Sequence, residues 1–347
     1  MRCMIMAAGL GTRLRPLTDQ IPKPMVPILN RPALYHILRL LAQHEITEVV
    51  VNLHYFPDLV TGYLGDGSNL GIDLRYSFEE ELLGTAGGVK NNQEFLGDDT
   101  FLVLSGDAVT DVDLTGLLAA HRAHGGISTL AVKEVEDPSE YGVVVLGEEH
   151  RVQGFQEKPA VEEALSLLCN TGMYVFEPAI FDRIPAGEFY DFGRMVFHEL
   201  LRDQVPFYVH AIDAYWNDVG GVAAYRQACF DALTGAVAVE RPGEEVSPGV
   251  WVGPGARLAP GAELRAPVLV GPGCTVEAGV VLEGPVTLGE GCVIGRGASL
   301  ARSILWNGVQ VGADASVTDC VIAGESRVAE GARVDGEIAG PGTSVGG

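Results

Sequence analysis

Hydrophobic and polar positions alternate in two different ways along the chain, and the pattern changes between residues 235 and 245. In the first part, short apolar runs such as residues 3–8 and 101–107 are separated by stretches with helical periodicity, such as residues 32–44. Strands that alternate with helices predict an α/β domain with a mainly parallel sheet, which we place at residues 1–235.

The second part of the chain follows a six-residue repeat. An aliphatic side chain occupies every sixth position without a break, at Val246, Val252, Leu258, Leu264, Val270, Val276, Leu282, Leu288, Ile294 and Leu300. After two slips of one residue, the spacing resumes at Leu305 and again at Ile322. Hexapeptide repeats are typical of a β-solenoid. This one resembles the left-handed parallel β-helix, in which three hexapeptides form a triangular coil, and we expect such a domain at residues 245–340.

The first apolar run ends in a loop that is suited to binding phosphate. Gly9 and Gly11 let the backbone approach a phosphate group closely. A dinucleotide-binding fingerprint would need a third glycine where this chain has Leu14, and the Gly-Lys pair of a Walker A loop is absent from the sequence. Two cations, Arg13 and Lys23, follow the first strand instead. This combination favours a nucleoside triphosphate whose β- and γ-phosphates leave together.

Residues 9–18 read GLGTRLRPLT, and Pro22-Lys23-Pro24 follows. This run resembles the signature of the sugar-nucleotide pyrophosphorylases, in which a Rossmann-like nucleotidyltransferase domain often precedes a left-handed β-helix. The resemblance covers nearly the whole chain. In EEELLGTAGG, DPSEYGVVV and NTGMYVF it is strongest to mannose-1-phosphate guanylyltransferases. It implies that a nucleoside triphosphate and a sugar 1-phosphate react to give a nucleotide-activated sugar and pyrophosphate.

Two aspartates match the positions where this family holds a catalytic Mg²⁺. Asp107 ends a buried apolar run, and Asp218 lies in the segment YWNDVGG. Two carboxylates suit a hard cation that also keeps water and phosphate oxygens as ligands. From the residues alone, either aspartate could equally be a helix cap or a turn residue.

The resemblance assigns residues to three overlapping groups. The catalytic group is Arg13, Lys23, Asp107, Lys158 and Asp218. The nucleotide-binding group is Ala8, Gly9, Gly11, Thr12, Arg13, Lys23, Glu81, Gly84 and Thr85. The sugar-binding group is Gly142, Glu157, Lys158 and Asn170. Because the attacking phosphate oxygen is already anionic, we expect no general base, and catalysis would consist of alignment and charge neutralisation.

The identity of the base depends on three glutamates at residues 79–81. Guanine presents two adjacent hydrogen-bond donors that one carboxylate can accept, whereas uracil and thymine present a single donor. A glutamate run therefore favours GTP with mannose 1-phosphate, although a solvated run of charges would look the same. Uridylyl or thymidylyl transfer to glucose 1-phosphate is the alternative.

The charge and composition of the chain limit the classes of partner that it is expected to bind. The formal net charge is -23, which disfavours nucleic acid and anionic membranes. No apolar run is long enough to span a bilayer, and we interpret the apolar N-terminus as a buried strand rather than a signal peptide. The six cysteines show no CxxC pairing, so buried, reduced thiols in the cytoplasm are expected. The open ends of a solenoid favour homo-oligomerisation, with the β-helix as the candidate contact surface.

Two other functions fit the same architecture. A β-helix can be an acyltransferase, but such sites use a histidine base and all eight histidines lie at or before His210. A non-catalytic regulatory relative would be expected to lose phosphate-loop or metal-binding residues, and this chain retains them. The enzyme is therefore the favoured interpretation.

Overall fold

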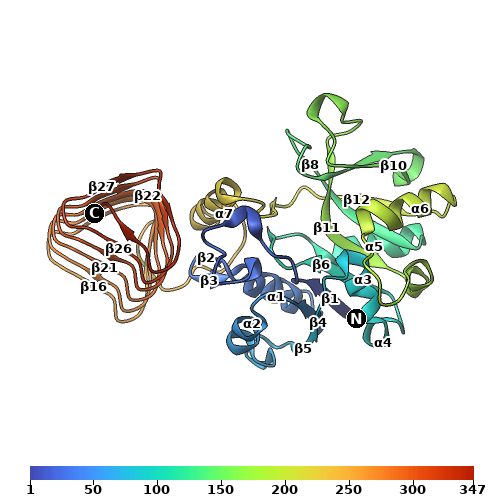
Figure 1. Ribbon diagram of the computed structural model, residues 1–347, viewed down its shortest axis with the longest axis horizontal. Coiled ribbons are helices and arrows are strands. Elements are labelled where there is room, and N and C mark those ends of the chain that lie inside the picture. Colours follow the sequence, from blue (N-terminus) through green and yellow to red (C-terminus); the bar gives the residue numbers. More distant parts are fainter. The chain divides into compact units, whose positions relative to one another are not determined.

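In the computed structural model, which describes residues 1–347, a nine-stranded sheet organises the N-terminal part of the chain (Figure 1). Seven of its strands follow the order β10-β9-β11-β6-β1-β4-β5, while β8 pairs with β11 and β12 pairs with β8. The strands are β1 (Arg2–Met6), β4 (Glu48–Leu53), β5 (Asp73–Phe78), β6 (Phe101–Ser105), β8 (Ser128–Glu134), β9 (Gly142–Leu146), β10 (Val152–Glu157), β11 (Leu168–Phe176) and β12 (Tyr208–Ala211).

Four of these strands, β6, β1, β4 and β5, form a parallel block at one side of the sheet, with β5 at its edge. Strand β1 pairs in parallel with β4 and with β6, and β4 pairs in parallel with β5. Strand β11 joins β6 in the antiparallel direction and extends the sheet. The helices are α1 (Ala33–Gln43), α2 (Pro57–Leu64), α3 (Gly84–Asn91), α4 (Gln93–Leu96), α5 (Leu114–His124), α6 (Phe197–Arg202) and α7 (Val222–Thr234). The predicted α/β domain with its parallel sheet is confirmed.

The chain forms two compact units, and each draws on separate segments. Unit 1 comprises Met1–Leu10 and Ile37–Trp216, and unit 2 comprises Gly11–His36 and Asn217–Gly347. Unit 2 therefore contains residues 11–24 of the signature run (called the signature loop below), helix α7 and the hexapeptide region together. The domain limits 1–235 and 245–340, drawn from the repeat pattern, stay a prediction.

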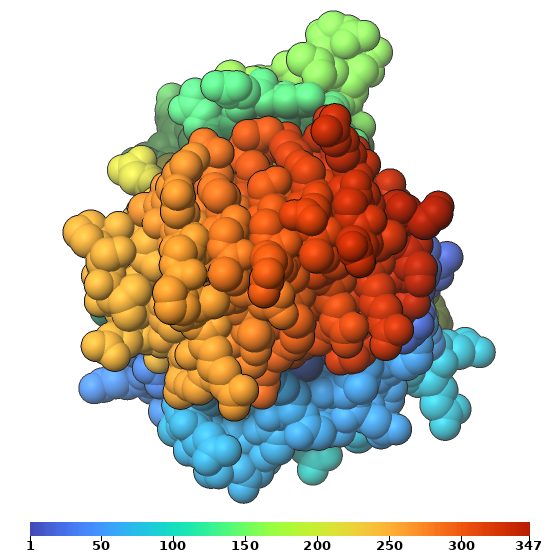
Figure 2. Space-filling view, turned by 90° about the vertical axis from the view of Figure 1, so that its left-hand side faces the viewer, coloured from blue at the N-terminus to red at the C-terminus, as the bar shows by residue number.

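Within unit 2 the hexapeptide region forms a parallel β-helix. Each strand pairs in register with the strand one coil later, as Val268–Val270 of β18 does with residues 286–288 of β20 (Val281–Leu288). Further strands are β15 (Val250–Val252), β22 (Ser299–Leu305) and β24 (Ser316–Thr318). The repeat aliphatics from Val270 onward are buried in one continuous core. Successive coils follow one another from yellow-orange to red in Figure 2. The predicted β-helix is confirmed.

One residue of the repeat lies outside the coils. Val246 belongs to β14 (Glu244–Ser247), which pairs antiparallel with β15, and its side chain is 55% exposed. The six-residue apolar spacing therefore extends one position beyond the buried core of the β-helix, onto a strand whose valine is exposed. All six cysteines are free and buried, and Cys274 and Cys292 lie in the β-helix core, as expected.

The slips in the repeat correspond to a corner that loses one residue. Leu282 pairs with Leu300, but Leu288 pairs with Leu305, so the coil shortens within β22. Where earlier coils turn at Ala266-Pro267 and Gly284-Pro285, later coils turn through Arg302 and Asp319 in the left-handed region, with φ of 45° and 55°. No helix of the structure is long and apolar enough to cross a membrane.

Candidate functional site

In unit 1 the end of β1 is fixed by a buried polar network. The Ala7 N–H donates to Oδ1 of Asn52 (2.7 Å), and Nδ2 of Asn52 donates to Oε1 of Glu79 (2.7 Å). The second carboxylate oxygen of Glu79 accepts the N–H of Leu83 (3.1 Å). Asn52 and Glu79 are both almost completely buried. The network thus links the start of the predicted phosphate loop, next to Ala8, to the segment that leads into α3.

The three glutamates of the predicted base loop have different environments. Glu79 is 6% exposed, and both of its carboxylate oxygens accept protein hydrogen bonds. Glu80 and Glu81 are exposed. Only Glu80 and Glu81 are therefore available to a ligand, and Glu79 has a structural role.

The segment Gly84 to Gly88 packs tightly against residues 188–192. Gly84 adopts a φ of 74°, and a Cβ there would lie 2.5 Å from the Tyr190 carbonyl oxygen. The hydroxyl of Thr85 donates to Oδ2 of Asp191 (2.9 Å) and accepts the N–H of Phe192 (2.9 Å). In the structure both predicted nucleotide-binding residues are thus engaged by protein atoms, and their contact with a nucleotide stays a prediction.

Asp107 follows the end of β6, beside an irregular stretch within β11 where the pairing with β8 shifts register. Its Oδ1 accepts a hydrogen bond from the Ser105 hydroxyl (2.7 Å). Gly172, with a φ of 74°, comes so close that a Cβ would lie 3.2 Å from the Ser105 Cβ. Asn170 accepts the Gly172 N–H (3.2 Å) and donates to the buried hydroxyl of Tyr174 (2.7 Å). The structure therefore brings the irregular part of β11 that contains Asn170, a predicted sugar-binding residue, close to the end of β6, which precedes the predicted metal ligand Asp107.

Glu157 and Lys158 lie at the end of β10 and are exposed. Lys158 has a φ of 48°, and its N–H donates to the Tyr141 carbonyl (3.0 Å). Partial desolvation, together with the negative charge of Asp191, raises the pKa of Glu157, while the cation of Lys158 opposes the shift. A Cβ on Gly142 would approach Glu157 Oε2 to 3.3 Å, so these predicted sugar-binding residues are neighbours.

In unit 2 the signature loop encloses Lys23. Gly11 adopts a φ of 62°, and a Cβ there would lie 2.7 Å from the Cβ of Lys23. The Thr18 hydroxyl donates to the Gly11 carbonyl (2.9 Å). Nζ of Lys23 donates to the backbone carbonyl of Asp218 (2.9 Å), although these residues are 195 positions apart. The structure thus brings together Lys23 and Asp218, while Thr12 and Arg13 are exposed on the short helical turn that follows Gly11.

The residues present are compatible with a magnesium ion. The structure contains no group of three or more His, Cys, Asp or Glu side chains that could hold a metal. A metal bound here would therefore have few protein ligands and would need phosphate oxygens and water, which is the coordination that Mg²⁺ accepts with nucleotide substrates. Asp107 and Asp218 offer carboxylate oxygens of the right chemistry. They belong to different units, and their joint role as metal ligands stays a prediction.

The structure adds residues that sequence reasoning left out. Ser105, Tyr174 and Asp191 each hold a predicted site residue or its loop by a hydrogen bond. Both ends of the Asn52 amide are likewise bound to protein. Asp191 and Asn52 could not be found from a local motif, because their partners lie at least 27 positions away along the chain.

Comparison with known proteins identifies the family of the chain. The model of the family described as nucleotidyl transferase matches residues 2–234. The chain belongs to this family. A second model, described as the GMPPB C-terminal domain, matches residues 264–347.

Two curated relatives differ in the substrates that they are named for. The UTP–glucose-1-phosphate uridylyltransferase of Synechocystis is 45% identical over 73% of this chain and 69% of its own length. The mannose-1-phosphate guanylyltransferase of Mycobacterium tuberculosis is 38% identical over 74% of this chain and 72% of its own length. Together with the family they support a sugar-1-phosphate nucleotidyltransferase activity and leave the base and the sugar undecided.

A solved structure shows the same fold. HddC from Yersinia pseudotuberculosis, complexed with GMP-PN, superimposes with a TM-score of 0.57 at 25% identity. The similarity covers 66% of this chain and 97% of HddC.

Proposed function

We propose that the protein transfers the guanylyl group of GTP to mannose 1-phosphate and releases GDP-mannose and pyrophosphate. The observation that carries the choice of base is the exposure of Glu80 and Glu81 directly before α3, while Glu79 is occupied within the fold. A carboxylate at this position can accept both donors on the pairing edge of guanine. The GMPPB C-terminal domain match and the guanine nucleotide in HddC support the same choice.

A second candidate is uridylyl transfer to glucose 1-phosphate. It is favoured by the 45% identity to the Synechocystis uridylyltransferase. Uracil offers one donor between two acceptors, so it would gain less from a carboxylate. The two candidates therefore make opposite predictions for the loss of the Glu80 and Glu81 charges.

In the proposed reaction an anionic oxygen of the sugar phosphate attacks the α-phosphorus of the triphosphate. The new phosphorus–oxygen bond forms as the bond to the bridging α–β oxygen breaks, and pyrophosphate leaves with that electron pair. No proton has to be removed from the nucleophile. Arg13, Lys23 and Lys158 would neutralise the charge on the phosphates and align the reactants. The hydrogen bond to the Asp218 carbonyl holds the Lys23 ammonium in one orientation.

Magnesium completes the proposed site. Asp107 and Asp218 would hold it, and when bound it would polarise the phosphate oxygens. The Ser105 hydroxyl, which donates to Asp107, would orient that carboxylate as a ligand. Removal of the metal with EDTA is expected to stop turnover, and added Mg²⁺ should restore it.

The test is pyrophosphate release with purified protein, Mg²⁺, four nucleoside triphosphates and several sugar 1-phosphates. We expect GTP with mannose 1-phosphate to have the highest kcat/KM. Glu80→Gln and Glu81→Gln are then compared, and at least one should lower kcat/KM for GTP by about tenfold while leaving UTP unchanged. A preference for UTP with glucose 1-phosphate would refute the guanine assignment and retain the reaction class. Folded protein that is inactive with every pair would favour a regulatory role.

Assembly is a separate proposal. The open ends of the β-helix are the expected surface for homo-oligomerisation. Light scattering at working concentration tests this, and a monodisperse monomer would contradict it.

A further inference from the structure

We infer that the β-helix positions the nucleotide-binding segment, and that Trp306 and Tyr225 are positioning residues for the triphosphate. The inference rests on the proposed role of Lys23 in binding the triphosphate. All residues involved belong to unit 2, in which Gly11–His36 and the β-helix form one compact body. The hexapeptide domain would then contribute to catalysis as well as to assembly.

A buried relay of two hydrogen bonds connects the β-helix to the segment that carries Lys23. The indole Nε1 of Trp306 donates to the hydroxyl of Tyr225 (2.8 Å), and this hydroxyl donates to the carbonyl of Pro27 (2.8 Å). Tyr225 is completely buried, and Trp306 is 8% exposed. The two rings meet edge to face with centroids 6.3 Å apart. Since the hydroxyl is both donor and acceptor, its geometry is determined from both sides.

A short rigid stretch joins Pro27 to Lys23. Lys23–Met25 forms a 3-10 turn, and the N–H of Val26 donates to the Lys23 carbonyl (3.1 Å). Residues 27–28 form β2, which pairs with β3 (Arg31–Pro32). A displacement of the Pro27 carbonyl is therefore transmitted to the backbone of Lys23 through fixed local structure.

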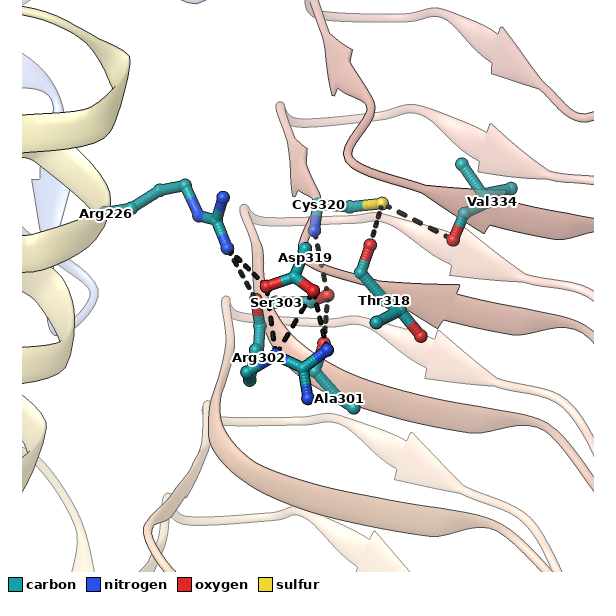
Figure 3. Close-up of polar contacts among 8 residues, drawn as sticks. All are labelled: Arg226, Ala301, Arg302, Ser303, Thr318, Asp319, Cys320 and Val334. Carbon is teal, nitrogen blue, oxygen red and sulfur yellow. Dashed lines mark hydrogen bonds and ion pairs between the residues drawn. The ribbon is translucent and has the colours of Figure 1, made fainter.

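Helix α7 is itself attached to a corner of the β-helix. The Arg226 guanidinium extends from α7 to the carboxylate of Asp319 (2.8 Å), which also accepts hydrogen bonds from Arg302 (Figure 3). Within the corner, the Ser303 hydroxyl donates to the Ala301 carbonyl (2.7 Å) and accepts the Cys320 N–H (3.1 Å). Arg302 and Asp319 lie at the corners where the coils are one residue shorter. The shorter repeat therefore places Asp319 where it can bind Arg226 of α7.

Helix α7 also holds the loop that contains Asp218 in place. This loop leads directly into α7, and Nδ2 of Asn217 donates to the Ala224 carbonyl (3.2 Å). Lys23 contacts the same loop through the Asp218 carbonyl. A helix fixed by the β-helix therefore holds Lys23 from two directions, at Pro27 and at Asp218.

Two direct contacts complete the attachment. Nδ2 of Asn30 donates to the Leu288 carbonyl in β20 (2.8 Å). In the last coils, a Cβ on Gly340 would lie 3.1 Å from the Cβ of Pro16, so the backbone there packs against the signature loop. Both ends of the Lys23 segment thus rest on the β-helix.

The experiment measures kcat, the KM for the triphosphate and the KM for the sugar 1-phosphate. It compares the full-length wild type with Trp306→Phe, Tyr225→Phe and the double variant. Tyr225→Phe removes the donor to Pro27 and should raise KM for the triphosphate by about tenfold, and Trp306→Phe by about threefold. KM for the sugar phosphate should change less than about twofold, because its proposed ligands lie in unit 1. The double variant should be no worse than Tyr225→Phe, because the indole N–H then has no partner to lose.

Trp251→Phe is the matched control. Trp251 lies in β15 of the same β-helix, beneath the guanidinium of Arg241, and takes no part in the relay. Its kinetics should equal those of the wild type. Thermal midpoints are measured for every variant, and kinetics are compared well below the lowest of them.

The outcomes separate this inference from the proposed function. An inactive wild type would refute the proposed function itself. An active wild type with unchanged KM values in both relay variants would overturn the positioning role. Equal changes in the two KM values, or additive effects in the double variant, would also overturn it and would reduce the relay to general support of the fold.

Discussion

The buried carboxylate of Glu79 can be tested by one substitution made at three adjacent positions. Glu79→Gln, Glu80→Gln and Glu81→Gln each exchange one carboxylate oxygen for an amide nitrogen. At residue 79 the two oxygens accept hydrogen bonds from Asn52 Nδ2 and from the Leu83 N–H. A glutamine can accept only one of them with its oxygen, so its amide group must face the other donor.

Rotation of the neighbouring amide does not remove this conflict. If Asn52 flips, its oxygen can meet the new amide, but its own NH₂ then faces the N–H of Ala7, which now donates to the Asn52 oxygen. Every arrangement therefore leaves one buried donor opposite another. A buried unsatisfied donor costs about 1–3 kcal/mol, and the weaker neutral hydrogen bond adds to this cost. Easier burial of a neutral group offsets part of it, so we expect a net loss of about 2 kcal/mol.

The assay is calorimetry of the first thermal transition, because a chain with two compact units need not unfold in one step. A loss of about 2 kcal/mol corresponds to a decrease of roughly 4–8 °C for a unit of this size. Glu80→Gln and Glu81→Gln should stay within about 0.5 kcal/mol of the wild type, because both side chains are exposed. Three indistinguishable midpoints would refute the network as a source of stability.

Two further predictions concern the loop and the β-helix corner. Gly11→Ala should lower the free energy of unfolding by about 1–2 kcal/mol, because of its positive φ and the nearby Lys23 Cβ. Gly9→Ala should leave stability unchanged, because a Cβ there meets nothing within 4 Å, and a selective rise in KM for the triphosphate would then locate the ligand beside it; equal destabilisation by both would contradict this. The Arg302 guanidinium, aided by Arg226, holds the pKa of Asp319 below its ordinary value of 3.8. The carboxylate therefore stabilises the fold above pH 3.8 and loses this effect as the pH falls through its folded pKa. Asp319→Asn should melt about 2–4 °C below the wild type at pH 7, from about 1 kcal/mol, and the gap should narrow as the pH falls below 3.8 towards the lower folded pKa; a gap that stays constant as the pH falls from about 4 to about 2 would refute the role of the charge.

The alternation of strands and helices and the β-helix could be predicted from the sequence, because both depend on the local periodicity of buried aliphatic side chains. The spacing does not show that Val246, on an entry strand that pairs antiparallel with β15, is exposed. The apolar spacing shows which residues are hydrophobic. Whether such a residue is buried depends on whether a neighbouring coil packs against it, and the spacing does not show this.

Only those residues of the candidate site that belong to a sequence motif could be predicted. Gly11 and Lys23 were recognised by local spacing, and the structure places them in contact distance. The role of Glu79 was not predictable, because it depends on Asn52, 27 positions earlier. Similarly, Thr85 is held by Asp191, 106 positions later. A run of three glutamates has no internal sign that one of them faces inward.

The division of the chain into units has a consequence for protein synthesis. The Pro27 carbonyl leaves the ribosome long before Tyr225, which follows it by 198 residues, and Trp306 comes another 81 residues later. At translation rates of about 5–20 residues per second, the signature segment waits roughly 10–40 s for its first partner on α7. During that interval the surrounding strands of unit 1 can already fold, while the segment between them has only its own local turn and the β2–β3 pair to hold it. Residues 225 and 306 are therefore synthesised long after the segment that they fix, and a nascent chain acquires an ordered Lys23 segment only once both have emerged.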